Sequence, residues 1–538
     1  MKKFKLKNIH VAIIVLGIIF NCISIFQTNL WFDEAYSVGL ASKSFKDIWI
    51  IGGHDVHPVL YYWILHIIYL ITSRFGASLG GTIIAYRVFC MVCISMLSIL
   101  GYTHIKRDFG EKVGILFSFF SLFLPTVCIY ASEVRMYSLA ILLVTLLAIY
   151  AYRLAKFGNL DKAEEELRKK NSEIIEDRVK LKHTRKNWLI FGITSLLCIY
   201  THYYALMAAG IINIVLLINL IRQKRKKDII TIIVLGVIQA IAYIPWIMCF
   251  LGQIKHVSKG FWIKFEFPNT IMQLSSSQFI GKITYGVGFF VSIVIYGYLI
   301  YKLYNAKKNN DEYKPALYAI LIYISVIIAA LIINLIMKTS ILYYRYLFAI
   351  TGLYIFFICY TLAKEKNKYI MMLVCGITLV LSIWSNYNQT MEVYDKSNSV
   401  PVSYVKERIQ PGDDIIFTES NFGAGVVLGM NFENNRKFFY NPTHWEAEEA
   451  YKAFGEQLRV CTDPDFHKEL SDRIWIIDSP DAEYYNKMFN NEQYKLVSQF
   501  LITVKYENYD YNIILVERVS ENATLENQEN IVIENVEV

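Results

Sequence analysis

The chain has 538 residues, of which 55% are hydrophobic, and its formal net charge is +8. Its hydrophobic content lies above that of ordinary soluble domains and excludes a typical soluble enzyme. The basic residues fall in short loops between apolar runs, so the positive charge does not indicate a nucleic-acid partner.

Long apolar runs repeat from residue 9 to about residue 388. Each has roughly 18 to 22 residues, enough to cross a hydrocarbon core of about 30 Å. The basic N-terminus, residues 1–8, leads into the first run without a small-residue cleavage site, which indicates an uncleaved first span. The predicted spans are 9–28, 82–104, 113–131, 137–155, 188–204, 205–221, 229–250, 284–303, 315–337, 346–363 and 369–388.

The segment 58–73 is also apolar, but it is short and contains His66. If it lies in the interface as a juxtamembrane helix, the loops on one side of the membrane hold about 30 Lys and Arg, against about 10 on the other side. The positive-inside rule then predicts a multi-pass protein of the cell membrane, with a cytoplasmic N-terminus and an extracytoplasmic C-terminal domain. The charged stretch 161–186 is expected to form a solvated cytoplasmic helix.

The polar region after the last span predicts a small α/β domain. A helix is expected at 402–410, strands at 414–418 and 473–477, and a hairpin from 497–506 and 511–516. The acidic stretch 519–538 is predicted to be disordered. The expected organisation is therefore an all-α polytopic membrane domain over 1–390, an extracytoplasmic α/β domain over 395–518, and a disordered tail.

Two features of the sequence argue against a disulfide scaffold, a structural zinc site and a dinucleotide site. Only one of the nine cysteines, Cys461, lies outside the apolar runs, so neither a disulfide scaffold nor a structural zinc site is indicated. Residues 423–429 (GAGVVLG) follow a predicted strand, but their spacing departs from a dinucleotide-binding turn and no clear βαβ unit is evident. We therefore reject a dinucleotide site.

Polar residues beside membrane spans are costly and therefore point to function. Under the predicted topology, five separated stretches of them meet on the outer face. The candidate site residues are Asp33, Glu34, Asp55, His57, Glu133, Arg135, Tyr137, His202, Tyr203, Arg345 and Tyr346.

These residue types suit one reaction. A carboxylate at the interface can deprotonate an acceptor hydroxyl during displacement at an anomeric carbon. Guanidinium groups can stabilise a polyprenyl-phosphate leaving group, and aromatic rings can stack on a sugar. Taken singly, the acidic pair could instead cap a helix, the arginines could be interfacial anchors, and His202 with its tyrosines could belong to an aromatic belt.

Metal binding is a further alternative. His54, Asp55 and His57 lie within four residues, and a divalent cation could be held near Asp33, Asp55 and His57. No other cofactor is indicated.

Residues 31–37 (WFDEAYS) and 54–62 (HDVHPVLYY) resemble the first outer loop of the GT-C superfamily of glycosyltransferases. The resemblance is closest to bacterial relatives of protein O-mannosyltransferases and of the lipid A aminoarabinose transferase. It continues through Arg87, residues 135–137 and residues 345–346, and it covers roughly 1–390. Val59 stands where family members usually have a second proline.

The resemblance implies an inverting, nucleotide-independent transfer from a polyprenyl-phosphate sugar. Asp33 matches the catalytic acidic position and would be the general base, with Glu34 beside it. The implied partners are this donor, membrane lipids, and an envelope acceptor that could be protein, polysaccharide, teichoic acid or lipid.

Two other functions remain open from the residues alone. A transporter or flippase of lipid-linked saccharides would have inverted repeats and charges at the membrane midplane. A non-catalytic subunit of an envelope-assembly complex would tolerate Asp33→Asn.

Overall fold

A computed structural model describes residues 2–158, 175–309, 313–441, 448–455, 457–519 and 532–535. The chain divides into two compact units. Unit 1 comprises Met1–Ile25, Val56–Ile64 and Ala85–Asn388, and unit 2 comprises Phe26–Asp55, Leu65–Ile84 and Gln389–Val538. Each unit therefore contains segments that are far apart in the sequence.

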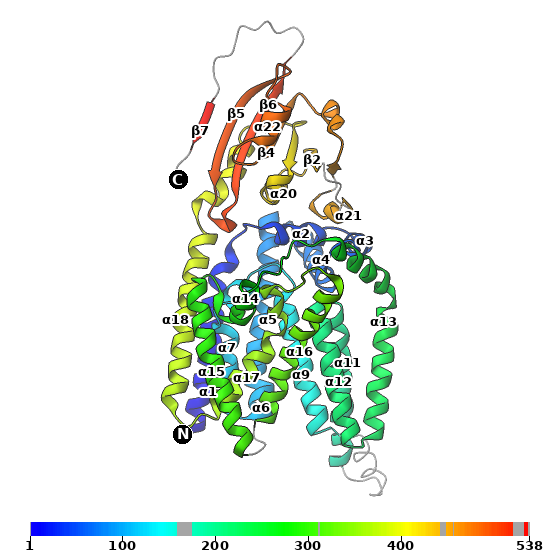
Figure 1. The fold of residues 1–538 in the computed structure, drawn as a ribbon, viewed down its shortest axis with the longest axis vertical. Coiled ribbons are helices and arrows are strands. Elements are labelled where there is room, and N and C mark those ends of the chain that lie inside the picture. The colour runs from blue at the N-terminus through cyan, green and yellow to red at the C-terminus, as the bar shows by residue number, and fades with distance from the viewer. Residues whose placement is uncertain are drawn as a thin grey trace. The chain divides into compact units, whose positions relative to one another are not determined.

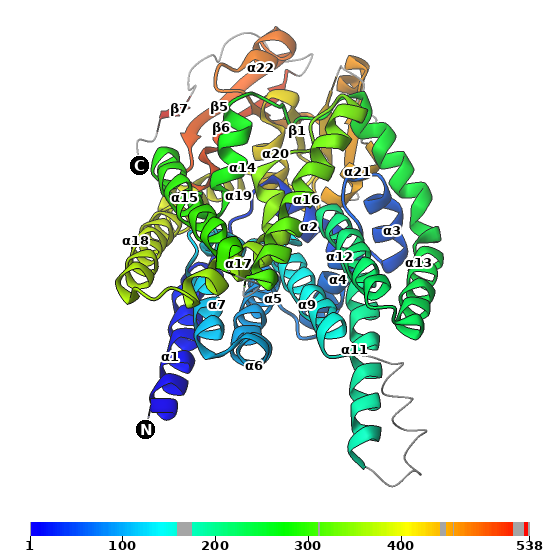
Figure 2. The same ribbon diagram turned by 60° about the horizontal axis from the view of Figure 1, so that its bottom comes forward.

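Unit 1 is a bundle of long apolar helices that run side by side (Figures 1 and 2). Its main helices are α1 (Lys2–Cys22), α5 (Leu79–Leu100), α7 (Glu111–Phe123), α8 (Val127–Tyr130), α9 (Tyr137–Lys156), α11 (Ile175–Ile199), α12 (Tyr203–Arg222), α13 (Lys226–Lys259), α14 (Asn269–Ile280), α15 (Tyr285–Asn309), α16 (Lys314–Met337), α17 (Thr351–Ala363) and α18 (Lys368–Val393). The π-helical turn η2 (Gly101–Ile105) and α6 (Lys106–Phe109) continue α5, and the 3-10 helix η3 (Tyr344–Ile350) precedes α17.

Nine helical segments of the described residues are long and apolar enough to cross a membrane. They confirm nine of the predicted spans and a multi-pass membrane protein. These segments are Asn8–Phe26, Leu79–Phe109, Tyr137–Lys156, Tyr203–Arg222, Lys226–Lys259, Tyr285–Lys302, Lys314–Met337, Tyr344–Ala363 and Lys368–Lys406.

The other two predicted spans, 113–131 and 188–204, are not among these nine segments of the described residues. In 113–131, α7 ends at Phe123 because Leu124 is extended ahead of Pro125, and α8 has only four residues. In 188–204, α11 ends at Ile199 and its N-terminal part is charged. Of the charged stretch 161–186, residues 161–174 lie outside the described part of the chain, and the rest begins α11.

The short segment 58–73 forms α4 (Leu60–Arg74), which has 15 residues. At a rise of about 1.5 Å per residue this helix is about 22 Å long, less than a hydrocarbon core of about 30 Å. It is not among the nine spanning helices of the described residues.

Unit 2 contains a sheet of seven strands in the order β3-β2-β1-β4-β6-β5-β7. The strands are β1 (Asp414–Thr418), β2 (Lys437–Tyr440), β3 (Leu458–Cys461), β4 (Arg473–Asp478), β5 (Tyr494–Thr503), β6 (Asp510–Arg518) and β7 (Val532–Asn535). Strands β3, β2, β1 and β4 are parallel, and β6 runs antiparallel to both β4 and β5. Figure 1 shows the long β5 and β6 beside each other.

Most elements predicted for this region are confirmed. The strands at 414–418 and 473–477 form, as does the hairpin of β5 and β6, and the predicted helix at 402–410 is α19 (Val400–Lys406). Within the stretch predicted to be disordered, Val532–Asn535 forms β7 and pairs in parallel with β5, whose outer edge offers unpaired backbone groups. The rest of the stretch from residue 520 onward lies outside the described residues.

Unit 2 also contains a βαβ unit that was not predicted from the sequence. Strand β1, helix α20 (Phe422–Gly429) and the parallel strand β2 follow one another. The glycines of α20 serve packing, because a Cβ on Gly425 or Gly429 would come within 2.8 or 2.5 Å of the Phe417 side chain. The glycine-rich stretch is therefore explained by the close approach of α20 to β1.

Unit 2 also contains α2 (Phe32–Ala41) and α3 (Phe45–Gly53), which follow the first membrane span in the chain. Helix α2 packs on C-terminal residues through aromatic side chains. The ring of Phe32 lies 5.7 Å from that of Phe422 and 5.3 Å from that of Phe454. A Cβ on Gly39 would come within 2.1 Å of the Ala453 carbonyl oxygen, so this contact requires glycine.

Candidate functional site

An aromatic cluster in unit 1 joins four of the predicted stretches. The imidazoles of His57 and His202 stack with centroids 5.3 Å apart. The ring of Tyr346 lies 6.0 Å from His57 and 5.4 Å from His202, and Tyr137 lies 5.6 Å from His202. Four candidate residues thus form one buried cluster.

Helix ends place these side chains. His202 is the N-cap of α12, and its Nδ1 accepts a hydrogen bond of 3.1 Å from the Tyr204 backbone N–H. Tyr137 begins α9. The loop that carries His57 is held to the end of α11 by a hydrogen bond of 3.1 Å from the Leu60 N–H to the Tyr200 carbonyl.

The turn between α8 and α9 carries Glu133 and Arg135, which are 8% and 4% exposed. Arg135 Nη1 donates to Tyr62 Oη at 3.4 Å. Arg87, on α5, is buried, and its Nη1 donates to the Ser132 carbonyl at 2.7 Å. Arg87 therefore positions the turn that carries Arg135.

Arg345 lies in η3 among aromatic rings. Its guanidinium carbon is 4.8 Å from the ring centre of Tyr343 and 6.0 Å from that of Trp262, and Nη2 donates to Tyr343 Oη at 3.3 Å. Neither Tyr62 nor Trp262 is among the site residues predicted from the sequence. The signal available for Trp262 was an aromatic pair, Phe261-Trp262, in a loop between two apolar helices.

Arg135 and Arg345 supply the positive charge of this cluster. Burial, and then the charges of Arg135 and Arg345, lower the pKa of His57 well below its ordinary value. Burial and Arg135 lower the pKa of His202 to about 3. Both imidazoles are therefore neutral at neutral pH.

The cluster also has unused hydrogen-bonding capacity. Among the described residues, His57 Nδ1, His202 Nε2 and Tyr137 Oη are buried without a hydrogen-bond partner. Buried polar atoms in native proteins are nearly always paired, so three such atoms in one cluster are suited to a polar ligand.

An apolar cavity of about 350 Å³ adjoins the cluster. Besides histidines and tyrosines, the polar residues that line the cavity include Gln253. The side chain of Gln253 accepts a hydrogen bond from Tyr203 Oη. The apolar lining comes mainly from α12, α13 and α16. These residues are Leu206, Met207, Phe250, Ile254, Val257, Ile333, Ile336, Met337 and Ile341.

The acidic candidates lie in unit 2. Asp33 and Glu34 occupy the first turn of α2, where the helix dipole favours carboxylates. Glu34 is fully buried and accepts a hydrogen bond of 3.0 Å from Tyr506 Oη, whereas Asp33 is half-buried. Asp55 follows the end of α3 and is also half-buried. Of the two neighbouring carboxylates on α2, Asp33 is therefore the one that solvent can reach.

The structure thus gathers His57, Arg135, His202, Arg345 and their tyrosines within unit 1, and places Asp33, Glu34 and Asp55 in unit 2. In the part of the chain that is described, no three His, Cys, Asp or Glu side chains are grouped so as to hold a metal ion. A cation near Asp33, Asp55 and His57 stays a prediction.

No family model and no curated protein matches this sequence. Solved structures do match the fold. The crystal structure of ArnT from Cupriavidus metallidurans in the apo state has a TM-score of 0.56 and 10% identity, over 94% of this chain and 97% of that one. The structure of ArnT bound to undecaprenyl phosphate has a TM-score of 0.54 and 11% identity, with the same coverage. This likeness shows that the chain has the fold of these ArnT structures over nearly its whole length, in agreement with the fold that the sequence resemblance implied.

Proposed function

We propose that this protein is a membrane glycosyltransferase that transfers a sugar from a polyprenyl-phosphate donor to an envelope acceptor on the extracytoplasmic face. The observation that carries the proposal is the buried cluster of unit 1. Guanidinium groups, neutral imidazoles and tyrosines adjoin a cavity of about 350 Å³ with an apolar lining. A polyprenyl phosphate has the matching chemistry, an anionic head and a long hydrocarbon chain. The ArnT structure bound to undecaprenyl phosphate supports this ligand class.

Arg135 and Arg345 would bind the donor phosphate. Both are close enough for their charges to act on His57. A fixed guanidinium stabilises the negative charge that grows on a phosphate as the glycosidic bond breaks. The unpaired polar atoms of His57, His202 and Tyr137 could bind the remaining phosphate or sugar oxygens.

Asp33 would act as the general base. Its carboxylate would accept the proton of the acceptor hydroxyl while that oxygen attacks the anomeric carbon. The bond from the anomeric carbon to the phosphate oxygen would break, and the polyprenyl phosphate would leave with the electron pair. Glu34 is buried and accepts a hydrogen bond from Tyr506 Oη, and it would orient the turn that carries Asp33.

The test is direct transfer by the purified full-length protein. It would be reconstituted with undecaprenyl-phosphate sugars carrying a radiolabelled hexose or aminopentose, together with envelope fractions as acceptors. The expected result is labelled acceptor and released undecaprenyl phosphate in equal amounts. Movement of labelled lipid across the bilayer without release of undecaprenyl phosphate would support a flippase and contradict the proposal.

A further inference from the structure

A second cavity in unit 1 lies toward the other ends of α12 and α16, two of the helices that line the first cavity. It has a volume of about 320 Å³ and is lined by α9, α12, α16 and α17. Lys156, Asn219 and Lys314 contribute to it, and they stand at the C-terminal ends of α9 and α12 and at the N-terminal end of α16. The candidate site lies at the opposite ends of these three helices, where α9 and α12 begin and α16 finishes. Since α12 has 20 residues, about 30 Å separates its two ends.

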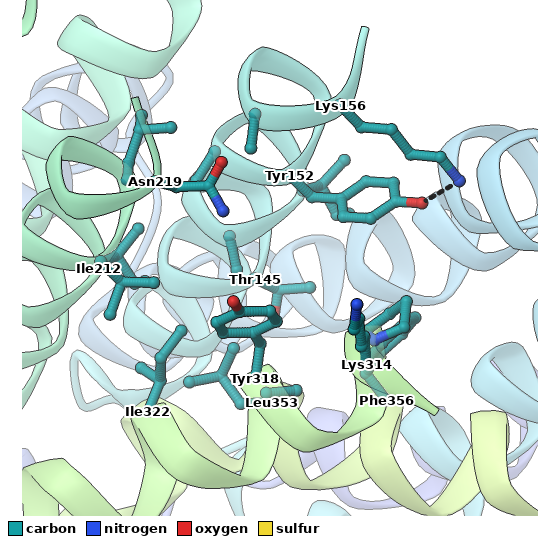
Figure 3. A pocket seen from close by; sticks show the side chains of 18 of the residues that line it. Thr145, Tyr152, Lys156, Ile212, Asn219, Lys314, Tyr318, Ile322, Leu353 and Phe356 are labelled. Carbon is teal, nitrogen blue, oxygen red and sulfur yellow. Dashed lines mark hydrogen bonds between the residues drawn. The ribbon is translucent and has the colours of Figure 1, made fainter. Parts of the chain in front are cut away.

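The body of this cavity is apolar. Small and aliphatic side chains from facing helices make room for a hydrocarbon chain (Figure 3). The principal residues of this kind are Ala148, Ile149, Ile212, Leu216, Ala319 and Leu353.

The polar residues of the cavity are cationic or neutral. Figure 3 shows Lys156 and Lys314 toward one side of the cavity and the amide of Asn219 toward the other. Lys156 Nζ donates to Tyr152 Oη at 2.8 Å and lies over the rings of Tyr152 and Phe157. Among the described residues no carboxylate forms an ion pair with Lys156, so its charge remains available to an anionic ligand.

A buried hydroxyl adds a separate observation. Thr145 lines the cavity and is 4% exposed, and its Oγ1 has no hydrogen-bond partner among the described residues. A Cβ on Gly352 would come within 1.8 Å of this oxygen, so the glycine leaves space for the threonine. An unpaired hydroxyl in an otherwise apolar cavity is suited to an ester or hydroxyl group of a bound molecule.

We infer that this cavity binds an acidic phospholipid of the surrounding membrane. One acyl chain would occupy the space between α9, α12, α16 and α17, and its phosphate would lie between Lys156 and Lys314. Basic pockets between membrane helices bind anionic head groups, and each lysine near such a group contributes about 1 kcal/mol. Under the orientation predicted from sequence, the lipid would come from the cytoplasmic leaflet, opposite the proposed transfer reaction.

The inference can be tested by native mass spectrometry of the full-length protein with phosphatidylglycerol or phosphatidylcholine of identical acyl chains. Wild-type protein should retain phosphatidylglycerol in preference to phosphatidylcholine. Lys156→Gln and Lys314→Gln should each weaken phosphatidylglycerol binding about fivefold, the equivalent of about 1 kcal/mol per lysine. Lys112→Gln removes an exposed lysine outside the cavity and should leave binding unchanged.

Ala148→Phe provides an independent variant, because it fills the apolar part of the cavity and keeps both lysines. It should reduce phosphatidylglycerol binding while the protein still elutes as a single species in size-exclusion chromatography. Equal retention of the two lipids by wild-type protein would overturn the inference. So would undiminished phosphatidylglycerol binding by the double lysine variant or by a folded Ala148→Phe protein.

Discussion

Glu34 Oε2 accepts a hydrogen bond of 3.0 Å from Tyr506 Oη, although 472 residues separate the two in the chain. Glu34 is fully buried and Tyr506 is 6% exposed. A second C-terminal tyrosine acts on the same turn, because Tyr509 Oη accepts a hydrogen bond of 2.9 Å from the Phe32 N–H. The polar C-terminal region therefore supports the acidic motif that follows the first membrane span.

We expect Tyr506→Phe to destabilise unit 2, because it leaves a buried carboxylate without this donor. A hydrogen bond to a charged group contributes about 1.5–3 kcal/mol. The measurement is a double-mutant cycle of Tyr506→Phe with Glu34→Met, which has no carboxylate to accept the bond, followed by thermal unfolding in detergent. The two effects should be non-additive, since both variants remove the same bond. Fully additive losses would mean that the bond contributes nothing to stability.

Asp33→Asn should abolish transfer while the protein inserts and folds normally. Removal of a general base typically lowers kcat by about 10²- to 10⁴-fold. The comparison is turnover of labelled polyprenyl-phosphate sugar by the wild-type and variant proteins. Asp47→Asn replaces an exposed carboxylate in the first turn of α3 and should retain turnover. Full activity of Asp33→Asn would remove Asp33 from the mechanism.

The membrane architecture could be predicted because span length and apolar content are local properties of the sequence. The main difference between the predicted and observed helices is near Leu124 and Pro125. The sequence stays apolar there although α7 ends, so hydropathy does not indicate the end of the helix. Hydropathy does not respond to proline's missing N–H or to its restriction of the preceding residue.

The candidate site could be predicted in part for a similar reason. His57, Arg135, His202 and Arg345 are polar residues at the ends of apolar runs, where a charge is costly. Tyr62 and Tyr506 could not be found in this way. Each is one tyrosine among 39, and its role depends on a partner that is distant in the sequence.

Arg345→Ala should impair use of the donor more than use of the acceptor. The loss of one fixed cation at a developing phosphate charge corresponds to about 10²- to 10³-fold in rate. Steady-state kinetics with each substrate varied in turn would show a lower kcat and a higher KM for the polyprenyl-phosphate sugar. Arg222→Gln, an exposed arginine at the far end of α12, is the matched control and should have normal kinetics. Unchanged donor kcat and KM in Arg345→Ala would contradict its assignment to the phosphate.

The two stacked histidines make stability depend on pH. In the unfolded chain His202 binds a proton near its ordinary pKa of about 6.5. In the folded protein, burial and Arg135 lower that pKa to about 3. Between these pH values the unfolded state binds more protons, so the free energy of unfolding decreases as the pH falls from about 6.5 toward 3. His57, whose pKa is lowered for the same physical reasons, adds to this effect.

His202→Gln should therefore flatten the acid side of the stability profile. The measurement is the apparent Tm of the purified protein between pH 7.5 and pH 4.5. The wild-type Tm should fall more steeply than that of His202→Gln, because glutamine has no proton to bind in the unfolded state. Parallel curves for wild-type and His202→Gln would show that this imidazole accepts a proton as readily in the folded protein as in the unfolded chain, which would be incompatible with its burial beside Arg135.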